Sequence, residues 1–306
     1  MLKKVTVDRL SVVGDRFQGI DLGTFLSGCI ALKGRGGAKY PYRDTYYFVD
    51  GSILQVAEIE CVRAGKVKEL RYEFNPSHAE RNEVFGELYM QVLRLFSGVE
   101  PTRIDLAMDF ELDMGQWRWF DSHARKRNIW YGLSGAVETV YFGSPQSDWR
   151  VRIYDKRKER QEAVEGVQEW QEGLTEVAAT GETSEQEQSP WWRVEAQLRG
   201  NVARGWWFGP SHSFPRHFNP FDGITPDVSD KPFPELGVKE RAMCHYLRSH
   251  PEAFSELAAN TRSKYKKLLQ GLSVLEAPVD LGQEYEQKKA HFVQEVRDWL
   301  ALAYIG

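Results

Sequence analysis

Three segments of the sequence alternate between apolar and polar residues, and their polar positions carry groups that could do chemistry on a phosphate. These positions are Arg103, Asp105, Asp109 and Glu111 in the first segment, Arg150, Arg152, Tyr154 and Lys156 in the second, and Arg193, Glu195, Gln197 and Arg199 in the third. Because alternate residues of a β-strand point to opposite faces, each segment predicts a strand with one apolar and one charged face. Paired in one antiparallel sheet, the three charged faces would form a platform.

The platform has two interpretations. It could be a solvated sheet face with cross-strand ion pairs, which are common and contribute little stability. It could also be a reaction centre, since the carboxylates Asp105, Asp109 and Glu195 are hard oxygen ligands of the kind that Mg²⁺ or Mn²⁺ prefers. Tyr154 would then attack a phosphodiester, and Arg152 or Lys156 would stabilise the phenolate and the charge that builds on phosphorus. The pattern alone leaves both interpretations open.

The elements that must position these residues can be predicted from hydrophobic periodicity and turn signals. Strand-like runs are expected at Val5–Val13, Phe25–Leu32, Thr45–Val62, Val67–Phe74, Arg103–Leu112, Glu138–Phe142, Trp149–Lys156 and Trp191–Arg199. Ser77 and Glu80 have the spacing of a capping box, and the apolar positions that follow, up to Phe96, predict a helix. A second helix is expected at Met114–Lys126, and the runs on either side of residues 143–148 predict a hairpin.

The fold class that follows is α+β, with a central, largely antiparallel sheet, helices on one face and a C-terminal helical subdomain. Residues 1–234 are expected to form the catalytic domain, and residues 235–306, with three or four helical patterns, the C-terminal subdomain. Between them the Gly-, Pro- and aromatic-rich stretch 200–234 suggests an irregular loop. Residues 161–190 are interpreted as an acidic insertion with a flexible second half.

Composition excludes some classes of protein. The formal charge of -4 and the pI near 6.0 argue against an electrostatic DNA binder, but eight glutamates lie between Gln161 and Gln188 and the remainder is about +4. No run approaches the ~20 apolar residues of a membrane span, and the start has no signal-peptide pattern, so a cytoplasmic location without membrane contact is expected. The three distant cysteines, Cys29, Cys61 and Cys244, predict reduced core thiols.

The same segments carry a resemblance to a known family. RIDLAMDF (103–110), TVYFGSPQSDWRVRIYDK (139–156) and WWRVEAQLRG (191–200), with weaker support from YEFNPS (72–77), resemble in this order the Rep_trans replication initiation factors of rolling-circle plasmids and related conjugative elements. The resemblance covers about 130 residues and favours the reaction centre over the solvated face. Two departures are the length of the acidic insertion and the single tyrosine of the nucleophile strand.

The resemblance implies an activity and assigns roles. Tyr154 would nick one DNA strand at an origin and form a 5′-phosphotyrosyl intermediate with a free 3′-hydroxyl, assisted by Lys156 and Arg152. Asp105, Glu195 and Asp109 would hold Mg²⁺ or Mn²⁺, with a strand-end ion pair as the alternative for Asp109. Expected partners are origin DNA, a host superfamily 1 helicase and a second copy of the chain, whose tyrosine could supply the second cleavage. A conjugative relaxase and a DNA-binding regulator that does not cleave remain alternatives.

Three further features have an ordinary structural interpretation beside a functional one. The loop 33–39 is Gly-rich and basic and could follow a DNA backbone or simply close a hairpin. The cluster Arg262, Lys264, Lys266 and Lys267 could contact phosphates or form a solvated helix face. Trp206 and Trp207 could stack on bases or pack under a loop.

Overall fold

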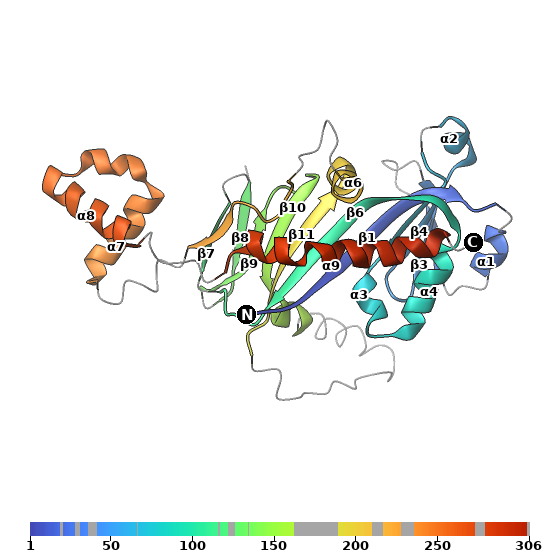
Figure 1. The fold of residues 1–306 in the computed structure, drawn as a ribbon, viewed down its shortest axis with the longest axis horizontal. Helices are drawn as coiled ribbons and strands as arrows, with labels where there is room; N and C mark the ends of the chain where they lie inside the picture. Colours follow the sequence, from blue (N-terminus) through green and yellow to red (C-terminus); the bar gives the residue numbers. More distant parts are fainter. Residues whose placement is uncertain are drawn as a thin grey trace.

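A ten-stranded antiparallel sheet, with strand order β2-β3-β4-β5-β1-β6-β11-β10-β9-β8, is the centre of the computed structural model (Figure 1). Its strands are β1 (Leu2–Arg16), β2 (Ala31–Arg35), β3 (Tyr42–Phe48), β4 (Ile53–Ala57), β5 (Leu70–Phe74), β6 (Phe96–Phe110), β8 (Arg127–Tyr131), β9 (Val137–Phe142), β10 (Trp149–Asp155) and β11 (Trp192–Arg199). The structure describes residues 1–18, 21–27, 31–35, 42–65, 67–115, 117–121, 126–133, 135–161, 189–209, 217–227, 236–272 and 279–304. Most of the acidic insertion and of the loop 33–39 lies outside these residues.

The sheet has one apolar face, and helices cover it. These helices are α3 (Pro76–Ala79), α4 (Glu83–Leu93), α6 (Gly200–Phe208) and α9 (Leu281–Ala301). Figure 1 shows α9 running across the sheet, where its Phe292 and Val296 join the same fully buried core as Leu106, Ile153 and other alternate strand residues. The α+β class and the one-sided helical layer predicted from the sequence are confirmed.

The three strands that carry the candidate residues lie next to one another, as predicted. β6 pairs with β11, β11 with β10, and β10 with β9 through the expected hairpin. These three pairings are antiparallel and have no register shift, so polar residues of one strand lie opposite polar residues of the next. The polar positions of β6, β10 and β11 therefore share the face opposite the helices.

Several local predictions are wrong. Residues 25–32 are not one strand, because Asp21 accepts hydrogen bonds from Gly23 and Thr24 and begins the short helix α1 (Leu22–Ser27) before β2. Residues 45–62 are interrupted by a turn in which Gly51 has a φ of 83°, a conformation that favours glycine, and β4 is followed by the helix α2 (Ile59–Arg63). Tertiary pairing and turn chemistry override the aromatic, β-branched pattern in both places.

Two more segments differ in type. Residues 114–126 do not form the predicted helix: β7 (Arg118–Asp121) pairs with β12 (Ile224–Asp227), and residues 122–125 are outside the described part. The stretch 200–234 is not wholly irregular, since it contains α6 and β12. Ala203 and Trp206 of α6 pack in the core, and Trp206 Nε1 donates to Tyr285 Oη at 2.6 Å. Burial of this aromatic face stabilises a helix that its glycines disfavour.

The capping prediction around Ser77 is also wrong. Asn75 accepts a hydrogen bond from Ser77 N and caps α3, and Asn82 accepts one from Val84 N and caps α4. Asparagine in this position satisfies a free N–H of the first helical turn, so two short helices replace the single one that was expected. Phe96, assigned to the helix by its spacing, is the first residue of β6.

The C-terminal helices divide between two hydrophobic clusters. α7 (Val238–Ser249), the 3₁₀ helix η2 (Pro251–Glu256) and α8 (Ala259–Leu272) enclose a small cluster of their own around Leu247 and Tyr265. α9 instead contributes five buried residues to the core of the main sheet. None of the helices in the described part of the chain combines the length and the apolar character of a membrane span.

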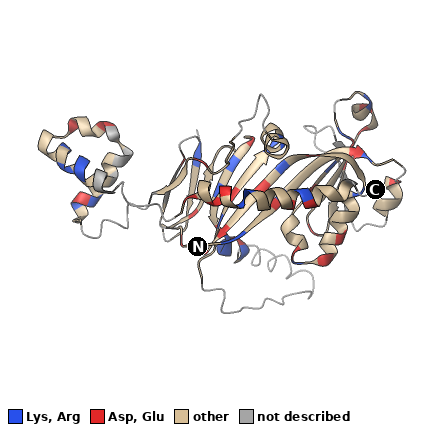
Figure 2. Cartoon of the chain, in the orientation of Figure 1, with Lys and Arg blue, Asp and Glu red and all other residues tan. Residues whose placement is uncertain are grey.

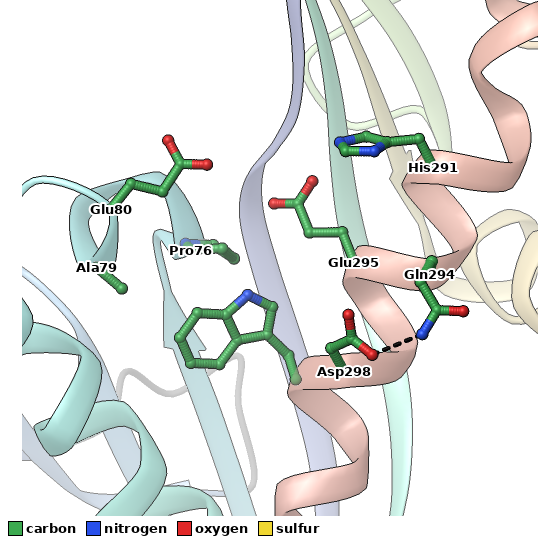
Figure 3. Close-up of a pocket in the computed structure, with 8 residues that line it drawn as sticks. Pro76, Ala79, Glu80, His291, Gln294, Glu295 and Asp298 are labelled. Carbon is green, nitrogen blue, oxygen red and sulfur yellow. Dashed lines mark hydrogen bonds between the residues drawn. The ribbon is translucent and has the colours of Figure 1, made fainter.

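A pocket of about 390 Å³ separates α3 from α9 on the helix-covered face of the sheet. Figure 3 shows Glu80 on one wall and His291, Glu295 and Asp298 on the other. Glu295 accepts the N–H of Val7 with both carboxylate oxygens, each at 3.0 Å, where the pairing of β1 with β6 is shifted. Burial raises the pKa of Glu295 to about 7. This carboxylate thus satisfies a strand N–H, but at the cost of losing its own hydration when ionised.

We predict that Glu295→Gln flattens the dependence of stability on pH. A carboxyl whose pKa is higher in the folded state than in the unfolded chain favours folding while protonated, so its contribution is lost as pH rises from about 4.5 to about 7. Between pH 4.5 and pH 8 the free energy of unfolding of the variant, relative to that of the natural chain, should rise by about 3 kcal/mol. Urea denaturation at both pH values measures this gain, with Glu286→Gln on the exposed side of α9 as the control; equal gains for both variants would contradict it.

Candidate active site

Three neighbouring rows of side chains cross the polar face of the sheet. The first row joins Thr139, Tyr154, Arg193 and Asp109; the second joins Tyr141, Arg152, Glu195, Ala107 and Thr6; the third joins Arg150, Gln197, Asp105 and Arg9. Residues directly opposite in an antiparallel pair have Cβ atoms about 5 Å apart. Tyr154, Arg152 and the three carboxylates singled out from the sequence therefore lie within a few strands of one another.

Tyr154 is almost fully buried, at 2% exposure, with two cations against it. Lys156 Nζ donates to Tyr154 Oη at 3.3 Å, and the guanidinium carbon of Arg152 lies 3.7 Å from the centre of the phenol ring. Burial, followed by the negative charge of Glu195, nevertheless raises the pKa of the phenol. These surroundings favour the protonated phenol unless positive charge is added nearby or negative charge is removed.

Glu159 restrains both of these cations. It lies in a helical segment, residues 156–161, that directly follows β10. One carboxylate oxygen accepts from Arg152 Nη1 at 2.8 Å, and the other accepts from Lys156 Nζ. The spacing from Lys156 to Glu159 is one helical turn, which places the two side chains on one face of the helix. The strand and the helix together hold the cations beside the phenol.

Arg193 occupies the position opposite Tyr154 on β11 and is 2% exposed. Its Nε and Nη2 donate to the two oxygens of Asp109 at 2.6 and 2.9 Å, and its Nη1 donates to Asp8 Oδ1 at 2.5 Å. Burial alone would lower the pKa of Arg193, but the hydrogen bonds to Asp109 and the charge of Asp8 raise it. Both oxygens of Asp109 are therefore committed to an ion pair, the alternative that the sequence left open for this residue.

Asp105 is held in a similar way by Arg103. Nε and Nη2 of Arg103 donate to the carboxylate, at 2.9 and 2.6 Å, and Gln197 Nε2 donates to Oδ2 at 3.3 Å. Asp105 is only 1% exposed, and its burial raises the pKa of the carboxyl. Arg103 is also 3.5 Å from Glu73, so the ion pairs continue from β6 onto β5.

Glu195 differs from the other carboxylates because it forms no hydrogen bond or ion pair with any described side chain. It is partly buried, and burial, followed by the negative charges of Asp105 and Asp8, raises its pKa to about 8. A cation placed near such a carboxylate would favour its ionised form. Within the described ranges, however, no three His, Cys, Asp or Glu side chains are already assembled as metal ligands.

Three residues of this site were missed by sequence reasoning. Arg193 stood on the predicted polar face but received no role, and Glu159 was signalled only by its spacing from Lys156. Asp8 gave no signal, because the pairing of β1 with β6 shifts between Val7 and Arg9 and interrupts the alternation. The bulge turns the side chain of Asp8 toward Arg193, on the same face as Arg9, whereas adjacent residues of a regular strand point to opposite faces.

The remaining sequence features lie away from the three rows. Trp206 is a core residue of α6, bonded to Tyr285, and Trp207 packs partly buried against the same core. Cys61 and Cys244 are free thiols, and Cys29 lies outside the described residues. His212 is outside as well, and His217 and His291 are not among the residues of the polar face.

Comparisons with known proteins find replication initiation proteins, the type of protein that the three sequence segments resemble. The chain is 30% identical to a replication initiation protein of Staphylococcus aureus over 214 residues, which are 70% of this chain and 58% of that protein. A second replication initiation protein of Staphylococcus aureus is 28% identical over 239 residues, 76% of this chain and 66% of its own length. The chain thus spans roughly three fifths of the length of these curated relatives.

No family model matches the sequence. A solved rolling circle replication initiator protein from Geobacillus stearothermophilus aligns with 66% of this chain and 77% of its own chain, at 19% identity and a TM-score of 0.39. Over 70% to 76% of its length, this chain is similar in sequence to replication initiation proteins.

Proposed function

We propose that this chain initiates rolling-circle replication by nicking one DNA strand at an origin with Tyr154, as the resemblance to the Rep_trans family implies. The observation that carries the proposal is the contact of Tyr154 Oη with Lys156 Nζ, at 3.3 Å, next to the row that contains the unpaired Glu195. The similarity to replication initiation proteins supports a role in starting replication, with DNA as the partner.

The proposed reaction is a transesterification. Tyr154 Oη forms a bond to the scissile phosphorus, and the bond from phosphorus to the 3′-oxygen breaks. The phenol loses one proton and the departing 3′-oxygen gains one, so the products are a 5′-phosphotyrosyl protein and a free 3′-hydroxyl. Lys156 and Arg152 are placed to offset the charge on the phosphate oxygens, and Glu159 keeps both cations beside the ring.

The donor set suits a divalent metal ion, since the carboxylates of the polar face offer hard oxygen ligands. Glu195, with Asp8 and Asp105 beside it, would hold Mg²⁺ or Mn²⁺, which when bound supplies positive charge to polarise a phosphodiester oxygen. Arginines occupy both oxygens of Asp105 and of Asp109, so Asp105 would have to release Arg103 in order to bind the metal, and Asp109 would have to release Arg193. The other proposed part of Asp109 is to fix Arg193 beside Tyr154.

A second DNA contact is proposed for the helices α7 and α8. Residues 236–272 carry seven lysines and arginines against three glutamates, a net +4, and Figure 2 shows basic residues on both helices. Arg262 donates to the carbonyls of Ser255 and Leu257, and Lys264 pairs with Glu240. Lys266 and Lys267 are exposed and have no acidic partner among the described side chains, so these two are the candidates for phosphate contacts.

The partners follow from the chemistry and the resemblance. The nucleophile strand has one tyrosine, so a second cleavage requires a second copy of the chain or a water molecule. We include a homodimer and a host superfamily 1 helicase in the proposal on the resemblance alone. A relaxase would use the same chemistry at a transfer origin, whereas a regulator that does not cleave would bind without covalent attachment.

The first prediction concerns the nucleophile. Tyr154→Phe should abolish the covalent adduct with a labelled origin oligonucleotide and change DNA binding by less than about 0.5 kcal/mol, because only the phenolic oxygen is removed. Denaturing gels measure the adduct, and fluorescence anisotropy measures binding. Tyr47→Phe, at an exposed tyrosine near the far end of the same sheet, is the control and should retain the adduct. An adduct of full strength in the Tyr154→Phe chain would show that another group attacks the DNA.

The second prediction concerns the metal. Glu195→Gln should lower the rate of metal-dependent nicking on the order of 10²-fold and weaken Mn²⁺ binding, while leaving the fold intact because Glu195 has no described partner to lose. Asp105→Ala is a poorer probe, since it would leave Arg103 buried without its carboxylate. Titration calorimetry with Mn²⁺ and nicking assays should be read together, with Glu111→Gln as the exposed control. Undiminished nicking by the natural chain in EDTA would refute the metal's role.

The third prediction concerns α8. Replacing Lys266 and Lys267 by glutamine should weaken duplex binding and reduce the slope of log K against log salt concentration by about 1.8, which is 0.9 for each phosphate that the variant leaves unneutralised. Adduct formation on a short single-stranded oligonucleotide should be unchanged. A chain with glutamine at Lys3 and Lys288 removes the same charge elsewhere and serves as the control. Equal slopes for the two double variants would remove α8 from the DNA interface.

A further inference from the structure

The edge strand β8 exposes a large aromatic side chain on the same face as the candidate active site. Trp130 is 64% exposed although its indole is among the largest apolar groups of the chain. Its neighbour Tyr131 is also exposed, and tryptophan and tyrosine are enriched at contact surfaces because each combines an apolar ring with a polar end. The proposed nicking reaction does not use Trp130, so its exposure calls for a separate explanation.

Strand register places Trp130 in the row of the nucleophile. Trp130 is opposite Thr139 of β9, and Thr139 is opposite Tyr154 of β10. Residues directly opposite in an antiparallel pair point to the same face, and neighbouring strands lie about 4.8 Å apart. The indole is therefore about 10 Å from the tyrosine along the row, with only the small side chain of Thr139 between them.

Two other exposed residues lie near Trp130. Asn128 belongs to β8 and Lys126 directly precedes the strand; with Trp130 they are spaced two residues apart, and all three are exposed. Asn128 is opposite Tyr141, in the row of Arg152 and Glu195, while the intervening Ile129 is opposite Val140 of the core. A cation, an amide and an indole thus follow one another along the edge of the polar face, next to the site where a phosphodiester is proposed to be cleaved.

This order of side chains matches the parts of a single nucleic-acid strand. A lysine contacts backbone phosphate, an asparagine can bond the edge of an unpaired base, and an aromatic ring stacks on a base at about 1–3 kcal/mol per base. Duplex DNA would hide the faces of its bases from the indole. A protein partner could also cover an edge strand, but nothing in an interface between copies would require a cation and an amide in line with the nucleophile.

We propose that the polar side of β8 is a subsite for single-stranded DNA, in which Trp130 stacks on a base close to the scissile phosphate, Asn128 contacts a base edge and Lys126 contacts the backbone. This subsite rests on the proposed function, because it extends the strand that Tyr154 attacks. It gives the protein a preference for unpaired bases beside the nick.

The test uses the full chain carrying Tyr154→Phe, so that binding is measured without cleavage. The probes are a fluorescein-labelled oligo(dT) and an oligonucleotide of equal length and charge in which every base is absent. Trp130→Ala should weaken oligo(dT) binding about tenfold and leave binding of the baseless probe unchanged, because only stacking is removed. Trp130→Phe should restore most of the affinity. Lys126→Gln should weaken both probes to the same extent, and Phe208→Ala, at 63% exposure on α6, should weaken neither.

Two outcomes would overturn the subsite. One is equal affinity of the Trp130→Ala and Phe208→Ala chains for oligo(dT). The other is a change of molar mass in light scattering caused by Trp130→Ala, which would assign the strand edge to an interface between copies. Adduct formation by the chain with Tyr154 intact tests the nicking function separately. If this chain forms an adduct but Trp130→Ala does not weaken oligo(dT) binding, only the subsite is refuted. If Trp130→Ala weakens oligo(dT) binding but no adduct forms, only the nicking is refuted.

Discussion

The buried guanidinium of Arg193 is the charge around which the polar face is arranged. It binds Asp109 with two hydrogen bonds and Asp8 with a third, and so ties β11 to β6 and to β1. Removing one partner of such a pair leaves a buried charge uncompensated, which costs about 3–5 kcal/mol. Because Arg193 lies opposite Tyr154 on the neighbouring strand, the same pairing that holds three strands together also fixes a charge beside the candidate nucleophile.

Most carboxylates of the polar face have a cationic partner, but the one beside the candidate nucleophile does not. Asp105, Asp109 and Glu159 each have a cationic partner, whereas Glu195 has none among the described side chains. Burial and neighbouring carboxylates raise the pKa of Glu195 to about 8, and burial also raises that of Tyr154. Added positive charge would favour the ionised form of both groups, which is the role proposed for the metal ion.

One face of the sheet carries the apolar core, and the other carries the candidate active site. On one face α4, α6 and α9 cover a continuous apolar core, and the pocket between α3 and α9 lies on that side. On the other face the rows of polar residues extend from β8 to β5 without a helical layer among the described residues, apart from residues 156–161. Changes on the polar face can therefore test the proposed chemistry and DNA binding with little effect on the apolar core, except where they unpair Arg103 or Arg193.

The alternation of residue types along the strands is enough to tell which residues face the polar side, because a two-residue period records the face of a strand directly. It therefore places Asp105, Asp109, Tyr154 and Glu195 on one surface, and with the helical patterns it predicts the α+β class. No local pattern contains the strand order, the partner of each charge or the bulge that turns Asp8 into the site, since these depend on segments far apart in the chain. The short elements depend on such segments too, since α1, α6 and β7 are stabilised by caps, buried aromatic faces and distant strands rather than by their own propensities.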